Sequence, residues 1–407
     1  MTIDANDIAM KYGLEGLRRA NEAAALAEEQ EGAALLDAVH EFLTRFIAYP
    51  QPEAAIAHAL WIAHTHLMEA WYCTPRIAFL SPEPQSGKTR AIEVTTTLVP
   101  EPIHTFTVSP AYLYRRVGDE ERAKPTILFD ETDAVFGSAN PESEPLRSII
   151  NAGHRRGAFA SRCAAVGNGR FVPEDIPAFC AVALAGLGDL PQTILSRSIV
   201  IRMRRRAPNE TVAAFRQRKQ DAEGNALRDR LAAWAATRVE RLKDVEPQMP
   251  EGIVDRNADI WEPLFAVADE AGGGWPERAR AAAVALVARV TAFQEDQGSM
   301  GIRLLKDLKR VFGEENNRTT ESLLQELVKL PESPWADIRG KPLDSRGLAN
   351  RLRQYEIKSK SMRVEGGFAR GYARADLHDA WRCYLPPSPA EAITSVTSGT
   401  VAADGDV

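Results

Sequence analysis

Glycine, lysine and threonine stand together at residues 87–89, where their surroundings allow phosphate chemistry. The apolar run Arg76 to Leu80 predicts a buried strand, the Pro- and Ser-rich stretch 81–86 breaks regular structure, and Ala91 to Val94 predicts the first turn of a helix. Strand, loop and Gly-Lys-Thr at a helix start form the setting in which a phosphate-binding loop works. The helix start offers unpaired N–H groups and the positive end of its dipole to a phosphate.

This interpretation gives the loop residues separate roles. Lys88 would reach the β- and γ-phosphates of ATP, and the Thr89 hydroxyl would bind Mg²⁺. The standard pattern G-x-x-x-x-G-K-[ST] has its first glycine where this chain has Pro82, so the loop departs from the pattern at that position. The expected nucleotide contacts are Pro84, Gln85, Ser86, Gly87, Lys88, Thr89 and Arg90.

A second apolar run, from Pro125 to Phe129, is followed by Asp130 and Glu131. A buried strand that ends in two acids is what a Walker B element needs: Asp130 would hold the Mg²⁺ shell, and Glu131 would polarise the attacking water. The alternative is an ordinary core strand with solvated acids at its tip. The Gly-Lys-Thr tripeptide about 40 residues earlier favours ATP binding and hydrolysis.

The composition is that of an ordinary soluble protein, with 44% hydrophobic and 26% charged residues among 407. The net charge of −6 means that a nucleic-acid partner would need a local basic patch. Four scattered cysteines without C-x-x-C spacing argue against a zinc site or disulfide framework and suit a reducing cytosol. With neither a signal peptide nor a long uncharged apolar span in the sequence, we expect a cytoplasmic protein without a membrane partner.

The order of patterns along the chain predicts an α/β P-loop NTPase core with helical and winged-helix-like additions. Strand and helix patterns alternate through the core, including a hairpin over 159–172, whereas the segment after residue 208 is almost wholly helical by pattern. The expected domains are an N-terminal helical segment (1–74), the ATPase core (75–207), a helical lid (208–318), a winged-helix-like domain (319–385) and a disordered tail (386–407).

The predicted winged helix carries a strongly basic stretch. Helix patterns at Glu321 to Lys329 and Ser345 to Tyr355 precede an extended run with a Gly366-Gly367 turn and a final helix from Ala375 to Tyr384. Residues 338–374 hold ten basic and three acidic residues, a net +7 that favours a phosphate backbone. A solvated basic face and a protein-binding winged helix remain the alternatives. The expected DNA contacts are Arg346, Arg351, Arg353, Lys358, Lys360 and Arg363.

Taken together, these stretches resemble the AAA+-like P-loop ATPases that carry a large C-terminal domain of unknown function. Such proteins occur in bacteria, phages and plasmids, sometimes fused to primase or helicase modules. The resemblance rests on Leu80 to Thr89, Leu128 to Asp133, the Gly-His-Arg-Arg-Gly run within Ile150 to Gly157, and Ala183 to Arg206, and it extends over most of the chain.

The resemblance implies further site residues. Arg197, in Leu-Ser-Arg before the last core strand, matches the arginine finger that approaches the γ-phosphate of a neighbouring subunit. The usual sensor 1 Asn or Thr is absent at Gly186 to Gly188, which leaves Asp189 as a stand-in, and Arg256 is the sensor 2 candidate.

Three classes of function follow from these patterns. The favoured one is an oligomeric, helicase-like ATPase motor with ATP and Mg²⁺ as cofactors and DNA as partner, a hexameric ring being one form, acting in phage or mobile-element DNA replication. The second is an ATP-driven assembly switch whose winged helix binds protein. A small-molecule kinase is third, because the sequence offers no acceptor site.

Overall fold

The computed structural model describes residues 30–385, apart from 107, 120, 133–143, 166–170, 297–299, 331–333, 339–340 and 365–366. Contacts divide the chain into two compact units, residues 1–290 and 291–407. Residues 1–29 of the predicted N-terminal helical segment and the predicted tail (386–407) lie outside the described residues.

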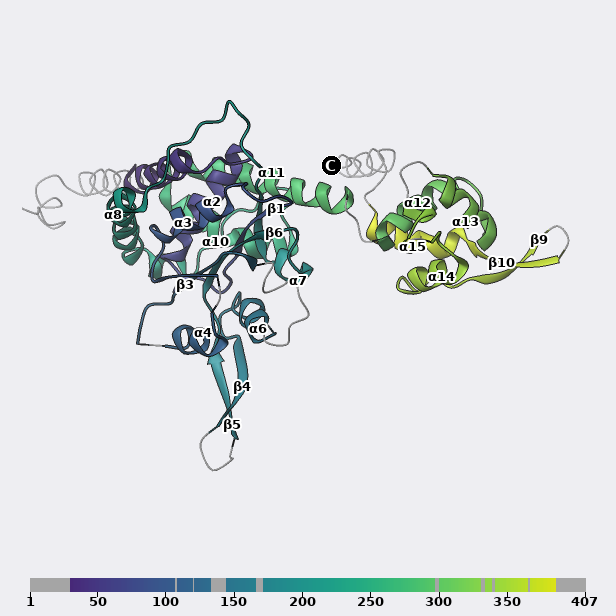
Figure 1. Cartoon of the computed structure of the whole chain (residues 1–407), viewed down its shortest axis with the longest axis horizontal. Coiled ribbons are helices and arrows are strands. Elements are labelled where there is room, and N and C mark those ends of the chain that lie inside the picture. The colour runs from purple at the N-terminus through teal and green to yellow at the C-terminus, as the bar shows by residue number, and fades with distance from the viewer. Residues whose placement is uncertain are drawn as a thin grey trace, which may run out of the picture. The chain divides into compact units, whose positions relative to one another are not determined.

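The first unit is built on a parallel five-stranded sheet with the strand order β2-β3-β6-β1-β7. Figure 1 labels three of these strands, β1, β3 and β6. All five strands run the same way, so the carboxyl ends of β1, β3 and β6 meet at one edge, where open α/β sheets place their ligands. The strands are β1 Arg76–Ser81, β2 Pro102–Thr105, β3 Thr126–Phe129, β6 Ala181–Leu187 and β7 Ser198–Arg202.

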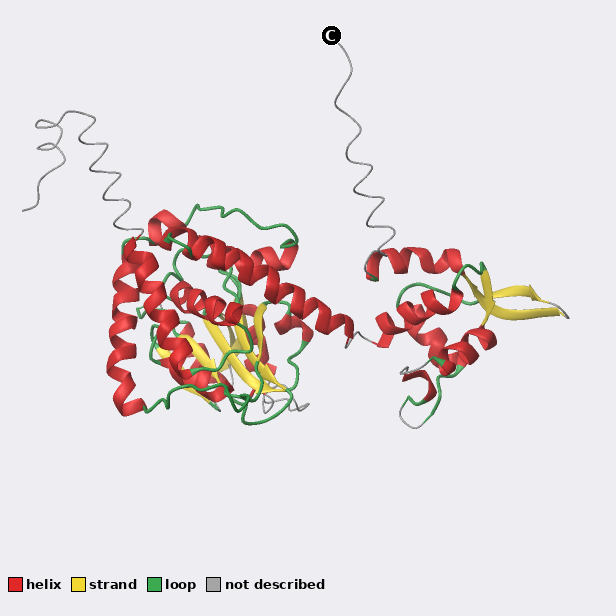
Figure 2. Ribbon diagram, turned by 90° about the horizontal axis from the view of Figure 1, so that it is seen from above, coloured by secondary structure: helices red, strands yellow, loops and turns green. Residues whose placement is uncertain are grey.

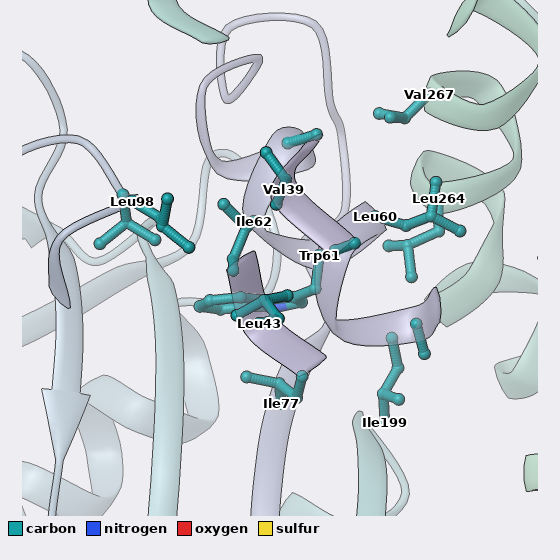
Figure 3. Packing of buried hydrophobic residues seen from close by; sticks show 14 of the residues in the cluster. Val39, Leu43, Leu60, Trp61, Ile62, Ile77, Leu98, Ile199, Leu264 and Val267 are labelled. Atoms are coloured by element: carbon teal, nitrogen blue, oxygen red, sulfur yellow. The ribbon is translucent and has the colours of Figure 1, made fainter. Parts of the chain in front are cut away.

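Strand β1 is buried on both faces, as expected for a central parallel strand. Ile77 and Phe79 face one hydrophobic core, and Ala78 and Leu80 face the other. The larger core packs the sheet against the helix at residues 30–46 and against α2, α3, α8, α10 and α11, as the helices around the sheet in Figure 2 illustrate. Figure 3 shows Trp61 of α2 within this core, together with Leu43 and Ile77.

The helices of the first unit are arranged around that sheet. Helices α4, α6 and α7 supply the smaller core on the opposite face. Together with residues 30–46, the helices are α2 Pro52–Thr65, α3 Lys88–Thr96, α4 Pro110–Val117, α6 Glu144–Ala152, α7 Gln192–Leu195, α8 Gln217–Ala236, α9 Val239–Leu242, α10 Asp255–Ala271 and α11 Trp275–Asp296.

The predicted helical lid (208–318) does not form a unit of its own. Leu231, Trp261 and Phe265 are buried in the same core as Ile77 and Phe79 of β1. The contacts divide the chain near residue 290 and not at the predicted boundary at residue 208. An amphipathic helix pattern shows which residues will be buried but not which core they will join.

A two-stranded antiparallel hairpin, β4 Phe159–Ala165 and β5 Phe171–Pro177, confirms the hairpin expected between the two acids and the last core strands. Figure 1 shows it extending away from the sheet beside α4 and α6. The side chains at its far end lie outside the described residues.

The second unit has its own core around Leu304, Leu323, Leu348 and Trp381. Leu304 to Phe312, expected in the lid, therefore belongs to this unit. A short strand that the sequence did not reveal, β8, pairs with β10 of the predicted wing in a sheet of order β8-β10-β9. The elements are α12 Met300–Phe312, β8 Asn317–Thr319, α13 Thr320–Lys329, a 3₁₀ turn Pro334–Ala336, α14 Ser345–Arg353, β9 Lys360–Val364, β10 Gly367–Ala373 and α15 Arg374–Tyr384.

Candidate active site

The Gly-Lys-Thr tripeptide lies where the sequence predicted, between β1 and α3 at the carboxyl edge of the sheet. Gly87 is the N-cap of α3 and has a φ of 86°, a left-handed conformation that glycine adopts without strain. Ser86 is buried, and its Oγ donates to Ser81 Oγ at 2.8 Å, which ties the end of the loop to the end of β1. The loop thus leaves the first N–H groups of α3 at the sheet edge, the arrangement that suits a phosphate.

The Lys88 ammonium curls back over this loop. It donates to Ser81 Oγ at 2.5 Å, to Ser86 Oγ at 3.1 Å and to the Glu83 carbonyl at 3.4 Å. These contacts hold the ammonium over the loop, at the place where a bound phosphate would lie. Arg205, at the end of the basic run after β7, also donates to the loop, from Nε to the Pro84 carbonyl at 3.0 Å.

The two acids follow β3 at the same edge, with β6 between β3 and β1. Asp130 is 3% exposed, and its Oδ1 accepts from the Glu131 N–H at 3.0 Å. Glu131 is exposed and has a φ of 60°, which is uncommon for a residue with a side chain. Such strained backbone clusters at functional sites.

The residues present fit a Mg²⁺ ion. Among the described residues, Asp130 Oδ2 is buried without a hydrogen-bond partner, and so is the neighbouring Thr132 Oγ1. A buried carboxylate oxygen without a partner is costly unless a cation or donor satisfies it. Carboxylate and hydroxyl oxygens are ligands that Mg²⁺ accepts, so Asp130 and Thr89 are the residues that would hold it.

A pocket of ≈ 530 Å³ opens beside the loop. One wall is Phe46, the last residue of the helix at residues 30–46, with Ile47 and Ala48 after it, and a second wall is Val212 to Phe215. The Ala213 N–H donates to the Arg45 carbonyl at 2.8 Å and joins the two walls. Arg90 donates to the Phe215 carbonyl at 2.7 Å and stacks over its ring at 5.4 Å. Because three distant segments build this pocket, no local pattern in the sequence announces it.

Asp189, the sensor 1 stand-in, follows β6 close to the loop. The Gly188 N–H donates to the Ser81 carbonyl at 3.0 Å, so the end of β6 adjoins the end of β1. The carboxylate of Asp189 accepts from Arg202 at 2.5 Å. Asp189 therefore lies at the same edge of the sheet as the phosphate loop, and its carboxylate forms an ion pair with Arg202.

Arg197, the predicted arginine finger, lies at the opposite edge of the sheet. The Arg76 N–H at the start of β1 donates to the Arg197 carbonyl at 2.9 Å, whereas the loop follows the far end of that strand. Five residue steps of about 3.3 Å separate the two ends of β1, a distance of roughly 17 Å. Arg197 cannot reach the phosphate loop of its own chain.

Arg256, the sensor 2 candidate, joins Arg197 rather than the phosphate loop. Its Nη1 donates to Ser196 Oγ at 3.4 Å, and both arginines line a pocket of ≈ 220 Å³ together with Arg155 and His154. Burial, reinforced by the charges of Arg256 and Arg155, lowers the pKa of Arg197. Three arginines against one carboxylate, that of Asp259, leave this small pocket positively charged, which favours an anionic ligand. The sequence pointed to Arg155 only through the Gly-His-Arg-Arg-Gly run of the family resemblance, and it gave no sign that His154 contacts Arg197.

The expected DNA contacts are spread over α14, the following loop and β9. Arg346 and Arg353 are exposed on α14, Lys358 is exposed in the loop, and Arg363 is exposed on β9. Two others are already engaged: Arg351 donates to the Gly347 carbonyl of its own helix at 3.2 Å, and Lys360 pairs with Asp376 at 2.7 Å.

Two negative findings concern the described residues. None of their helices is long and apolar enough to cross a membrane. Within the same part of the chain, no group of three or more His, Cys, Asp or Glu side chains is arranged to hold a metal ion.

The chain is an α/β protein in which a parallel sheet presents a Gly-Lys-Thr loop and an Asp-Glu pair at one edge. Residues 202–384 match the protein family described as "Protein of unknown function (DUF3631)". A relative from Saccharopolyspora erythraea, "Uncharacterized 28.9 kDa protein in xis 5'region", is 45% identical over 188 residues, which cover 46% of this chain and 70% of the relative. The chain belongs to the same family as this relative.

Two solved structures show a remote likeness to this chain. The A form apo structure of the NrS-1 C-terminal region is 11% identical, covers 83% of this chain and 74% of that one, and has a TM-score of 0.36. A structure of Drosophila ORC bound to DNA is 14% identical, covers 86% of this chain and 92% of that one, and has a TM-score of 0.24. TM-scores this low support no statement about activity.

Proposed function

We propose that this chain is a Mg²⁺-dependent ATPase of the AAA+ type. The observation that carries the proposal is the meeting of two separate elements at one edge of the sheet. Lys88 and Thr89 follow β1, and Asp130 and Glu131 follow β3, so strands distant in sequence deliver a phosphate cradle and two acids to the same edge. ATP hydrolysis needs these parts together, because catalysis of phosphoryl transfer is mostly positioning and charge stabilisation.

The nucleotide would lie across the loop and the adjoining pocket. The triphosphate meets Lys88 and the N–H groups at the start of α3, and the nucleoside enters the adjoining pocket against a wall that includes Phe46 and Phe215. Both aromatic side chains are buried, at 3% and 9% exposure, and pack edge-to-face at 5.1 Å, so they form a stable apolar wall. This wall offers apolar contact to the body of a ligand, while the loop residues of the same pocket supply the polar groups that orient it.

The reaction assigns separate tasks to the side chains. Lys88 holds the β- and γ-phosphates, Asp130 and Thr89 hold the metal, and Glu131 takes a proton from the attacking water. When bound, Mg²⁺ neutralises charge that develops on the transferred phosphoryl group. Glu131 is exposed, which keeps its carboxylate accessible to water.

The proposed assembly is a homo-oligomer in which Arg197 completes the site of a neighbouring copy. Its location at the opposite edge of the sheet from its own phosphate loop supports an action between subunits. A trans-acting arginine of this kind stabilises the charge of the transition state. The proposed nucleic-acid partner is DNA, which Arg346, Arg353 and Arg363 of the winged-helix-like second unit would contact at phosphates.

The test is ATP hydrolysis by the purified chain with Mg²⁺, compared between wild type and two variants. Lys88→Ala should weaken both ATP binding and turnover, whereas Glu131→Gln should bind ATP and leave it uncleaved. Lys243→Ala, at an exposed lysine paired with Glu240, is the matched control and should hydrolyse ATP like wild type. Wild-type turnover by the Glu131→Gln variant would show that the acid pair is not a Walker B element.

Addition of DNA separates the motor from the alternative assembly switch. A DNA-directed motor hydrolyses ATP faster with single- or double-stranded DNA than without it. A rate that no nucleic acid changes, together with ATP-dependent assembly, would favour the switch whose second unit binds protein.

A further inference from the structure

The side chain of Arg197 is held by two contacts inside its own chain. Its Nη1 donates to the Thr193 carbonyl at 2.6 Å, and its Nε donates to His154 Nε2 at 3.1 Å. His154 lies just after α6, and its carbonyl accepts from the Thr74 N–H at 2.9 Å. Two segments thus hold the guanidinium at the amino edge of the sheet, and a third, at Thr74, holds the backbone of His154.

The contacts of His154 define its tautomer. Nδ1 lies 2.8 Å from the Asn151 carbonyl, which can only accept, so Nδ1 carries the proton. Nε2 then has a lone pair and accepts from Arg197 Nε. One ring therefore links the end of α6 to the guanidinium of Arg197.

The surroundings keep this histidine neutral. Burial is the main cause that lowers the pKa of His154 to about 4, and Arg76, Arg197 and Arg155 lower it further. A protonated ring could not accept from Arg197 and would add a fourth charge to the arginine pocket. At the pH of a cell the ring remains an acceptor.

We propose that His154 is a positioning residue that aims the Arg197 guanidinium at the nucleotide of a neighbouring subunit. This inference rests on the proposed ATPase function. An arginine has five N–H donors, and the contacts with Thr193 and His154 occupy two of them. The contacts found among the described residues leave the other three N–H groups for an anion. Preorganisation matters here because a catalytic group that must be ordered during the reaction loses part of its effect.

The test measures kcat and KM for ATP in three full-length variants. His154→Phe keeps a ring but removes the acceptor, so kcat should fall about tenfold while KM stays near the wild-type value. His154→Gln restores an uncharged acceptor and should recover most of the lost kcat. Arg197→Ala should lower kcat at least as much as His154→Phe, and the double variant should be no slower than Arg197→Ala alone, because His154 acts through Arg197.

His40→Phe is the matched control, since His40 is also half-buried and also lies beside an arginine, Arg278. It should leave kcat unchanged. His154→Leu, with its thermal midpoint measured, replaces the phenylalanine variant if that one does not fold. If Arg197→Ala is slow but neither apolar variant at position 154 is, the inference about His154 is overturned and the ATPase proposal stands. Absence of ATP hydrolysis in the wild type would instead overturn the proposed function.

Discussion

Two residues at the candidate site hold backbone angles that are unfavourable for a side chain. Gln85 in the loop has a φ of 63°, and Glu131 has a φ of 60°. Only three other non-glycine residues in the described part of the chain have a positive φ. Each such conformation costs on the order of 1–3 kcal/mol and persists only where surrounding structure enforces it. Their presence on both halves of the site is consistent with a backbone shaped for a ligand.

Buried histidines make the stability of the first unit depend on pH. His58 and His64 are fully buried, and burial lowers the pKa of His58 to about 3 and that of His64 to about 4, below the ordinary 6.5. Since only the unfolded chain gains protons between pH 6.5 and 4, the free energy of unfolding should fall by roughly 1.4 kcal/mol per pH unit for each histidine as the pH drops.

Urea unfolding of the full chain at several pH values between 7 and 5 checks this prediction. In the His58→Gln/His64→Gln double variant, the free energy of unfolding should fall less steeply as the pH drops, because the contribution of these two histidines is gone. This holds whatever the stability of the variant at pH 7. An identical slope in wild type and variant would mean that these histidines are not the groups that titrate.

At the scale of elements, Gly87 connects the phosphate loop to α3, and its φ of 86° predicts a specific pair of effects. Gly87→Ala leaves room for the new Cβ, which would lie 3.6 Å from Met203 Cε, but forces alanine into a left-handed conformation that costs about 1–2 kcal/mol. The loop can escape this strain only by moving, so ATP affinity should fall along with stability.

Gly252 offers the matched control for that experiment. Its φ is 84°, and a Cβ there meets nothing within 4 Å, so Gly252→Ala carries the same strain outside the candidate site. Both variants should have lowered thermal midpoints, and only Gly87→Ala should lose affinity for a fluorescent ATP analogue. Equal ATP affinity in the two variants would mean that nucleotide binding does not depend on the left-handed conformation of Gly87.

Helix α14 carries the proposed DNA contact. Arg346 and Arg353 are seven residues apart, so they lie on the same exposed face of this helix, opposite the buried Leu348 and Leu352. If both lie on phosphates of duplex DNA, replacing both with Gln should make the slope of log K against log[salt] shallower by roughly two units while ATP binding is retained.

Two arginines elsewhere in the second unit provide the comparison. Arg310 on α12 and Arg382 on α15 are exposed, and Arg310→Gln/Arg382→Gln removes the same total charge. That variant should keep the wild-type salt slope. Equal slopes for the two double variants would show that α14 does not contact phosphates directly.

The sequence predicted these elements with unequal success, for physical reasons. The strands before Gly87 and Asp130 were found because central parallel strands are continuous apolar runs. The hairpin and most helices after residue 208 were found from their periodicity. Assignment of α12 to a core failed, since its apolar face fits any core. The pocket walls at Phe46 and Phe215 and the contact between His154 and Arg197 were missed because each joins segments that only the folded chain brings together.

For the whole molecule, the decisive feature is the division of one proposed catalytic site between two edges of the sheet. Lys88 lies beyond the carboxyl end of β1, and Arg197 lies at its amino end, beside Arg155 and Arg256. A single copy therefore cannot bring all the proposed catalytic groups to one nucleotide. Oligomerisation is a requirement of the proposed chemistry rather than an addition to it.

Mixing two inactive variants tests this division. Arg197→Ala should bind ATP but hydrolyse it slowly, and Lys88→Ala should bind ATP poorly. In a mixed oligomer, an interface that takes Lys88 from the Arg197→Ala copy and Arg197 from the Lys88→Ala copy has both groups, so part of the activity should return. A mixture of the Lys88→Ala and Glu131→Gln variants is the control. Each site takes Lys88 and Glu131 from the same copy, so every site in this mixture lacks one of the two groups. No activity should return. Failure of the first mixture to regain activity, together with a monomeric mass in the presence of ATP, would contradict the assembly.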